Sequence, residues 1–202
     1  MKRRKFVQYT GAAAAGLVSL SLSGRSFAAD PLRVGIIGTG DRGTGILKLI
    51  NEIDGMQVTA CCDIIPERLE NAISSVSGKA AAYKDYRALL EDTSIDAVVI
   101  SVPYKLHAQM ALDALDAGHH VYCEKTMVHD FEATKRLVEK VESRPNQTFQ
   151  VGHQYHNSRL YHKVAEVIEN GYCGEIIGID CQWNRNANWR RPVSDPKWEK
   201  II

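Results

Sequence analysis

The stretch Arg33-Val-Gly-Ile-Ile-Gly-Thr-Gly-Asp-Arg-Gly43 decides the fold of this chain. It is an apolar run that leads directly into Gly38-x-Gly40-x-x-Gly43, and the acid Asp63 closes a second apolar run further on. In this pattern the first glycine allows a tight turn, the second lets the backbone approach a pyrophosphate, and the third lets helix and strand pack closely. The N–H groups and the positive dipole end of the following helix then bind the phosphates. A glycine loop can also be an ordinary turn, but strand, helix and acid together predict a dinucleotide-binding βαβ unit.

Apolar runs and amphipathic segments alternate from residue 32 onward. The runs expected to form strands, which are short and nearly continuously apolar, are Leu32–Ile37, Gln57–Cys62, Ala97–Val102, His120–Cys123 and Thr148–Val151. The segments expected to form helices are Thr44–Ile53, Pro66–Val76, Asp85–Leu90, Lys105–Ala117 and Asp130–Ser143. This alternation predicts an α/β fold with a doubly wound parallel sheet of the Rossmann type over residues 30–150.

The pattern changes after Gly152. A helix is expected over Ser158–Asn170 and a strand over Glu175–Trp183, followed by a polar, tryptophan-rich stretch. Residues 151–202 are too few for an independent α/β layer. We therefore expect them to be the incomplete start of a second α/β domain, in a chain truncated at its C-terminus.

The first 28 residues are typical of a targeting segment. Lys2-Arg-Arg-Lys5 precedes a moderately apolar run, and Ser26-Phe-Ala28 resembles a cleavage site. The pair Arg3-Arg4 resembles a twin-arginine export signal, which carries folded proteins with their cofactors. The apolar run is too short to span a bilayer, so no stable membrane anchor is expected. A frayed amphipathic N-terminus is the alternative to an exported, periplasmic protein.

Composition excludes several function classes. The chain has 202 residues and a net charge of +1, but without residues 1–28 it keeps 20 basic and 24 acidic side chains. This balance predicts no basic surface for nucleic acid. Three of the five cysteines (Cys61, Cys62 and Cys123) lie in apolar runs and are expected to be small buried hydrophobes. The histidines lack metal-ligand spacing, so no metal site is predicted.

Asp63 sits where a carboxylate can accept hydrogen bonds from the adenosine ribose. It would repel a 2′-phosphate, so NAD is favoured, with NADP as the alternative because Arg42 and Arg68 lie close enough in sequence to shield a phosphate. The alternative for Asp63 itself is a helix-capping acid before Pro66.

A second constellation, Val121-Tyr-Cys-Glu-Lys-Thr126, follows a strand whose carboxyl end should border the ligand crevice. Glu124 and Lys125 would face the cofactor there, and a lysine can donate a hydrogen bond to a substrate hydroxyl or carbonyl oxygen. From spacing alone, a solvent-exposed Glu-Lys pair at the start of a loop is an equal alternative.

Four segments together resemble the glucose–fructose oxidoreductase/inositol dehydrogenase (Gfo/Idh/MocA) family: Gly38–Gly43, Cys62-Asp63, Ser101-Val-Pro103-x-x-x-His107 and Tyr122–Lys125. The similarity covers residues 32–191 and includes Asn184-Arg-Asn-Ala-Asn-Trp-Arg-Arg-Pro192, a stretch found in exported sugar oxidoreductases of that family. It implies a Rossmann domain followed by an α/β domain whose open sheet forms the substrate face and the interface of a homo-oligomer.

The resemblance also implies site residues. Lys125 would be the catalytic lysine, with Glu124, Ser101, Pro103 and His107 at the nicotinamide end. The full expected cofactor set is Gly38, Thr39, Gly40, Asp41, Arg42, Gly43, Asp63, Ser101, Pro103, His107, Glu124 and Lys125. Candidate substrate contacts are Gln154, Arg185, Trp189 and Arg190.

Two departures from the family pattern matter. Thr126 replaces the proline of the family's Glu-Lys-Pro motif, and the family's Asp and His spaced four residues apart do not occur within residues 151–202. The leading hypothesis is hydride transfer between a nicotinamide and a hydroxyl carbon of a sugar or polyol. The alternatives are glycoside cleavage through transient oxidation by NAD, or a cofactor-binding fragment without turnover.

Overall fold

A computed structural model describes residues 30–184, 186 and 198 of the chain. Six strands form one sheet: β1 (Leu32–Ile37), β2 (Met56–Cys62), β3 (Ala81–Tyr83), β4 (Ala97–Ile100), β5 (His120–Glu124) and β6 (Phe149–Gly152). Their order is β3-β2-β1-β4-β5-β6, and every neighbouring pair is parallel. The order reverses between β1 and β4, as in a dinucleotide-binding Rossmann sheet. The predicted doubly wound α/β fold is confirmed.

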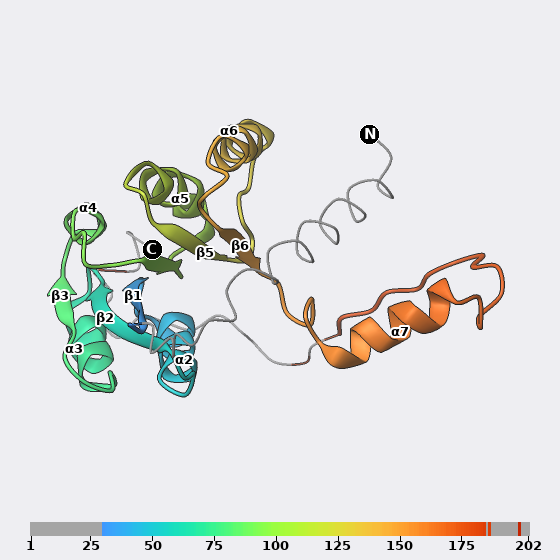
Figure 1. Ribbon diagram of the computed structural model, residues 1–202, viewed down its shortest axis with the longest axis horizontal. Helices are drawn as coiled ribbons and strands as arrows, with labels where there is room; N and C mark the ends of the chain where they lie inside the picture. The colour runs from blue at the N-terminus through green and yellow to red at the C-terminus, as the bar shows by residue number, and fades with distance from the viewer. Residues whose placement is uncertain (1–29, 185, 187–197, 199–202) are drawn as a thin grey trace, which may run out of the picture. The chain divides into compact units, whose positions relative to one another are not determined.

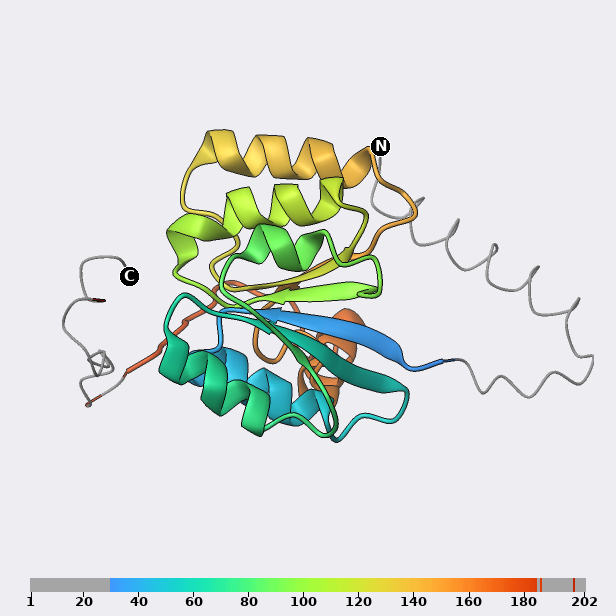
Figure 2. The same cartoon turned by 90° about the vertical axis from the view of Figure 1, so that its left-hand side faces the viewer.

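Helices cover both faces of the sheet. They are α2 (Asp41–Ile50), α3 (Pro66–Ser74), α4 (Tyr86–Leu90), the short 3₁₀ helix η1 (Tyr104–Leu106), α5 (His107–Asp116) and α6 (Phe131–Glu142). Helices α2 and α3 lie on one face, and α4, α5 and α6 lie on the other (Figures 1 and 2). Right-handed crossovers between parallel strands produce this two-sided cover.

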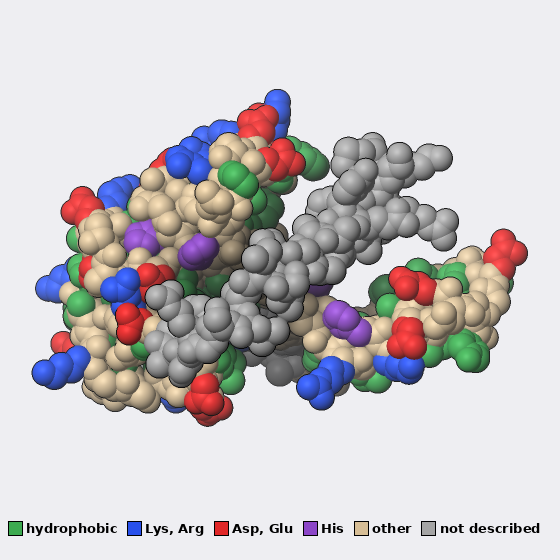
Figure 3. Space-filling model, in the orientation of Figure 1, with side chains coloured by type: hydrophobic (Ala, Val, Ile, Leu, Met, Phe, Trp, Pro, Cys, Tyr) green, Lys and Arg blue, Asp and Glu red, His purple; other side chains and the backbone are tan. Residues whose placement is uncertain are grey.

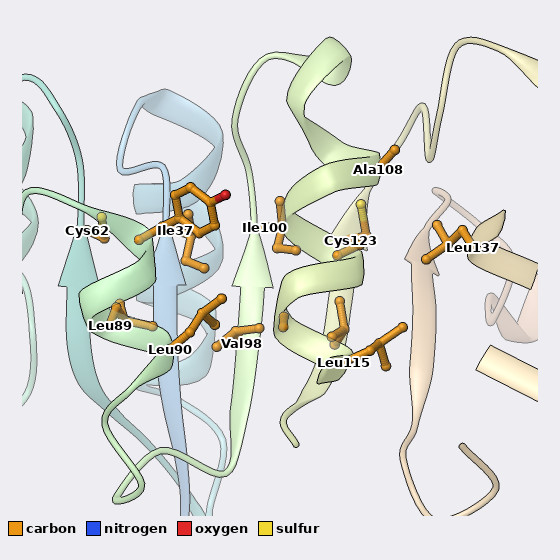
Figure 4. Packing of buried hydrophobic residues seen from close by; sticks show 14 of the residues in the cluster. Ile37, Cys62, Leu89, Leu90, Val98, Ile100, Ala108, Leu115, Cys123 and Leu137 are labelled. Atoms are coloured by element: carbon orange, nitrogen blue, oxygen red, sulfur yellow. The ribbon is translucent and has the colours of Figure 1, made fainter. Parts of the chain in front are cut away.

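Alternating strand residues supply two hydrophobic cores. In β1, Val34 and Ile36 pack in the core under α2 and α3, whereas Ile37 joins the core under α4, α5 and α6. Figure 4 shows part of the second core, where Ile100 and Leu115 lie between the sheet and α5. Because side chains of a strand alternate between faces, a strand buried on both sides must be apolar throughout. This explains the continuous apolar runs.

Polar caps set several helix starts as predicted. The Asp130 carboxylate accepts a hydrogen bond from the Ala133 N–H at 2.7 Å, and Asp85 accepts one from Arg87 N–H at 2.9 Å. Pro66 occupies the first turn of α3. Helix α2 begins at Asp41, three residues before the predicted Thr44, because the glycine loop itself forms the helix start.

The observed strands differ from the predicted ones in two places. The three-residue β3 was not predicted, because Ala81-Ala-Tyr83 is too short to show a period. The strand expected over Glu175–Trp183 is absent: the structure assigns no strand to these residues. A strand requires a neighbour for its backbone hydrogen bonds, and none of the described residues pairs with this segment.

Beyond β6, the chain forms α7 (Arg159–Glu169), within the predicted helix Ser158–Asn170. No residue of α7 is buried among the described residues, and its apolar side chains Leu160, Val164 and Ile168 are exposed. On the face shown in Figure 3, Lys and Arg side chains are interspersed with Asp and Glu. None of the helices in the described part of the chain is long and apolar enough to cross a membrane. The targeting segment predicted over residues 1–28 lies outside the described residues.

Candidate active site

The carboxyl ends of β1, β2 and β4 border a cavity of about 410 Å³. Five of the predicted cofactor residues line it: Gly38, Gly40, Asp63, Ser101 and Pro103. Ligands of open α/β sheets bind at the point where the strand order reverses, and this cavity lies there. The structure therefore brings the glycine loop, the acid after β2 and the loop after β4 to one place.

The glycine loop has the steric properties that the sequence predicts. Gly38 has φ +87°, and a Cβ there would lie 2.5 Å from the Ser101 carbonyl oxygen. A Cβ on Gly43 would overlap the carbonyl of Gly38. Gly40 is the N-cap of α2, and no described side chain caps this helix. The start of α2 thus offers N–H groups without intrahelical acceptors to an anionic ligand.

Asp63 fixes the glycine loop from behind. Its Oδ2 accepts hydrogen bonds from Thr39 N–H at 2.8 Å and from the Thr39 hydroxyl at 3.1 Å, and its Oδ1 accepts from Ile65 N–H at 2.9 Å. Asp63 as a whole is 9% exposed. The N-cap of α3 is Ile65, without a side-chain cap, so the helix-capping alternative for Asp63 does not hold. A carboxylate has about four lone-pair sites, so one site on Oδ1 remains for a further donor such as a ribose hydroxyl.

The loop after β3 adds charges that the sequence did not indicate. Lys84, Asp85 and Arg87 line the cavity together with Arg68, whose guanidinium lies 3.6 Å from the position of a Cβ on Gly40. Because β3 was missed, nothing in the sequence placed Lys84 and Arg87 at this edge of the sheet. Lys84 and Arg87 could have been placed at this edge only by recognising β3 as a strand that pairs with β2.

An ion pair joins Arg42 of the glycine motif, whose side chain is 50% exposed, to the buried Glu124 at the end of β5. The Arg42 guanidinium donates to Glu124 Oε1 at 2.7 Å, and the Glu124 side chain is only 7% exposed. This hydrogen bond raises the pKa of Arg42 above its ordinary value. A Cβ on Gly152 would lie 2.8 Å from Glu124 Oε1 and 2.5 Å from the Tyr122 hydroxyl. Tyr122 and Gly152 therefore complete the surroundings of Glu124. The sequence places Tyr122 in the Val121–Thr126 motif without a role, and nothing in it indicated Gly152.

Lys125 is exposed directly after β5, and no described residue pairs with its ammonium group. It does not line the cavity. Its peptide bond to Thr126 is cis. Of the equal alternatives for Glu124 and Lys125, an exposed Glu-Lys pair is excluded, because Glu124 is buried and pairs with Arg42.

The other predicted cofactor residues lie around the cavity rather than on it. Thr39 and Gly43 are buried behind the loop, and Asp41 and Arg42 are exposed at the start of α2. His107 is 1% exposed, with Nε2 2.8 Å from the Val102 carbonyl oxygen and Nδ1 2.8 Å from that of Thr126. It therefore lies beneath the loops instead of lining the cavity.

The predicted substrate residues are only partly described. Gln154 is exposed and lines a separate hollow with Tyr155, His156 and Tyr161. The other three, Arg185, Trp189 and Arg190, lie outside the described residues.

The cysteine prediction is confirmed. Cys61, Cys62 and Cys123 are buried, and burial raises the pKa of each thiol to about 12. Within residues 30–184, 186 and 198, no group of three or more His, Cys, Asp or Glu could hold a metal ion.

Comparison with known proteins agrees with this geometry. Residues 32–153 match the model of the Gfo/Idh/MocA oxidoreductase family, described as having an NAD-binding Rossmann fold. Inositol 2-dehydrogenase of Salmonella paratyphi B is 30% identical over 73% of this chain and 44% of its own length. A glycosyl hydrolase family 109 protein of Shewanella pealeana is 27% identical over 98% of this chain and 49% of its own length.

A solved structure gives the same result. The myo-inositol dehydrogenase of Lactobacillus casei in complex with NAD(H) and myo-inositol is 31% identical, with a TM-score of 0.66 over 70% of this chain and 42% of that one. This chain spans less than half the length of the relatives it matches. The chain belongs to the Gfo/Idh/MocA oxidoreductase family, and its residues 32–153 form that family's NAD-binding Rossmann fold.

Proposed function

We propose that this protein transfers hydride between NAD and a hydroxyl-bearing carbon of a sugar or polyol. The observation that carries the proposal is Lys125, an exposed lysine next to the buried, ion-paired Glu124 at the same sheet edge as the glycine loop. The relatives named inositol dehydrogenases support a polyol as the substrate class.

The residues at this edge fit a dinucleotide. The glycine loop leaves the start of α2 open to a pyrophosphate, and a Cβ on Gly38 or Gly43 would fill the space between loop and sheet. Asp63 keeps one acceptor site for a ribose hydroxyl. Arg68, Lys84 and Arg87 line the same cavity and would tolerate a 2′-phosphate, so NADP is the weaker alternative.

Bound NAD supplies the acceptor for a hydride, which leaves the substrate carbon with its electron pair. The chain's own part is electrostatic: the Lys125 ammonium donates a hydrogen bond to the substrate oxygen and stabilises negative charge that develops there. The hydroxyl proton must pass to a base. We propose the histidine of the family's Asp/His motif for this role, and its position beyond Ile202 stays a prediction.

Replacing Lys125 tests the proposal. In the protein expressed from its complete reading frame, Lys125→Ala should lower kcat by about 100-fold or more while NADH still binds, since a positioned proton donor contributes about 10²–10⁴-fold. Lys135→Ala, which removes an exposed lysine of α6, is the matched control and should turn over normally. Full turnover of Lys125→Ala with inositols and sugars would exclude the proposed role.

Glycoside cleavage through transient oxidation is the second candidate. It is favoured by one observation, the similarity of the Shewanella pealeana glycosyl hydrolase family 109 protein over 98% of this chain. An aryl glycoside supplied without added cofactor separates the two functions. Release of the aglycone would favour the hydrolase, whereas turnover that requires added NAD favours the dehydrogenase.

We also propose that the protein is exported to the periplasm by the twin-arginine route and that its full-length form is a homo-oligomer. The basic start with Arg3-Arg4 and the short apolar run support the first proposal. A folded reporter fused to residues 1–28 should reach the periplasm, and Arg3→Lys with Arg4→Lys should retain it in the cytoplasm.

The proposed hydride transfer also includes contacts to the sugar or polyol by four residues: Gln154, Arg185, Trp189 and Arg190.

A further inference from the structure

His107 connects two loops of the candidate site. It is the first residue of α5, and its ring lies between the Val102 carbonyl oxygen and the Thr126 carbonyl oxygen, each 2.8 Å from a ring nitrogen. Val102 follows β4, and Thr126 follows β5. The two acceptors thus belong to the two loops that leave neighbouring strands at the carboxyl edge of the sheet.

The histidine ring is suited to hold these loops. Its side chain is 1% exposed, so water does not compete for the two carbonyls. A neutral ring donates one N–H, to the Thr126 carbonyl when the proton is on Nδ1 and to the Val102 carbonyl when it is on Nε2. A buried hydrogen bond of this kind orders the backbone on either side of its acceptor.

Lys125 lies between two anchored neighbours. On one side Glu124 accepts a hydrogen bond from Arg42 at 2.7 Å. On the other side the Thr126 carbonyl oxygen lies 2.8 Å from His107 Nδ1, which donates to it when the ring proton is on Nδ1. Lys125 itself has no partner among the described residues. The backbone of Lys125 therefore fixes where its flexible side chain begins, and that backbone is held by the neighbouring residues.

We infer that His107 is a positioning residue that places Lys125 for catalysis by holding the Thr126 carbonyl. This inference rests on the proposed function of Lys125. Because the His107 ring is buried and faces carbonyls on both sides, it does not touch the substrate itself.

The chain contains a matched control for this histidine. His119 is 4% exposed, and its ring nitrogens lie 3.0 Å from the Ile95 carbonyl oxygen and 2.9 Å from that of Leu90. These carbonyls lie at the opposite, amino-terminal edge of the sheet, far in sequence from Lys125. A substitution of His119 therefore removes the same chemistry without touching the lysine loop.

Two conservative variants separate the two contacts of His107. The asparagine amide reaches about as far as Nδ1, so His107→Asn keeps a donor for Thr126. The glutamine amide reaches about as far as Nε2, so His107→Gln keeps a donor for Val102 and loses Thr126. If His107 acts through Thr126, the asparagine variant should rescue what the glutamine variant loses.

Hydrogen exchange of the 202-residue chain is the first measurement, and it needs neither cofactor nor turnover. In His107→Gln, amides of residues 124–128 should exchange about five- to tenfold faster, the effect of one lost buried hydrogen bond. In His107→Asn they should stay near the wild-type rate. The His119→Gln variant should change exchange near residues 90–96 only. Equal exchange at 124–128 in all three variants would overturn the inference.

Kinetics of the protein from its complete reading frame is the second measurement. His107→Gln should lower kcat about 10- to 100-fold, as expected for a catalytic group misplaced by about 1 Å, with little change in the KM for NAD. His107→Asn should recover most of this loss, and His119→Gln should leave kcat near wild type. Equal loss of kcat in His107→Gln and His119→Gln would overturn the inference even where Lys125→Ala is inactive. An active Lys125→Ala would instead exclude the proposed function.

Discussion

The two edges of the parallel sheet use the same kinds of contact for different purposes. At the amino-terminal edge, Arg33 pairs with Asp96 at 2.8 Å, and His119 bridges two carbonyls. Each of these contacts joins two structural segments.

At the carboxyl-terminal edge, an acid, an ion pair and a histidine again connect loops. Asp63 holds the glycine loop, Arg42 pairs with Glu124, and His107 bridges the loops after β4 and β5. Here, however, the contacts surround a cavity of about 410 Å³ and leave Lys125 exposed. The comparison teaches that a buried polar contact is not itself a sign of function: what distinguishes the site is the space and the unpaired group that such contacts leave open.

Because the glycine loop at the carboxyl edge is closely packed, a Gly→Ala substitution in it should cause the largest loss of stability. Gly43→Ala places a Cβ against the Gly38 carbonyl, and we expect a loss of about 3 kcal/mol in the free energy of unfolding, the upper range for overpacking. Urea unfolding followed by circular dichroism measures it, and NADH fluorescence should show weaker binding.

Gly45→Ala is the control in the same helix. No atom lies within 4 Å of a Cβ on Gly45, so alanine should stabilise the protein by about 0.5–1 kcal/mol through helix propensity alone. Equal stability of the two variants would show that the close contact at Gly43 has no energetic weight.

The next largest effect is the difference in stability cost between removing the two ion pairs. Arg42→Ala leaves the Glu124 carboxylate buried without its partner and should cost about 2 kcal/mol of stability. Arg33→Ala at the other edge removes a bidentate pair, but it leaves Asp96 34% exposed to water where Glu124 is 7% exposed, and should cost about 1 kcal/mol. Thermal or urea unfolding of both variants gives the comparison.

A second substitution separates lost charge pairing from lost packing. Glu124→Gln in the Arg42→Ala background removes the unpaired charge and should restore part of the stability. If Arg42→Ala costs no more than Arg33→Ala, the two edges do not differ in the way that their burial indicates.

The sequence predicts the carboxyl edge in outline because its signals are local. The glycine spacing, the apolar run before it and Asp63 lie within one βαβ unit, and each has a steric or electrostatic reason that a single segment reveals. The caps at Asp85 and Asp130 are local for the same reason.

Contacts between distant segments could not be predicted. Arg42 and Glu124 are 82 residues apart, and His107 meets Thr126 only because β4 and β5 are neighbours in the sheet. The short β3 has too few residues for a period, so Lys84 and its loop were missed. The expected strand over Glu175–Trp183 shows the opposite error, because an apolar segment is a strand only where a neighbouring strand pairs with it.

The smallest effect concerns acid titration at the amino edge. Hydrogen bonds from the Arg33 side chain and backbone lower the pKa of Asp96 from 3.8 to about 2. A group whose pKa is lower in the folded state stabilises the fold above its unfolded pKa, and that contribution is lost as the pH falls through the folded value. Asp96→Asn should therefore be less stable than wild type near neutral pH, and the difference in the free energy of unfolding should shrink between about pH 4 and pH 2.

Urea unfolding across this pH range measures the difference. In an Arg33→Ala background the same substitution should show a weaker pH dependence, because the side-chain hydrogen bonds that contribute most to lowering the pKa of Asp96 are gone and only the backbone N–H remains. If the difference in the free energy of unfolding between wild type and Asp96→Asn is unchanged below pH 2, Asp96 stabilises the fold through its shape or through hydrogen bonds of its uncharged form. Its charge then has no part in that stabilisation. The two edges would then share buried hydrogen bonds, and only the carboxyl edge would depend on an ion pair.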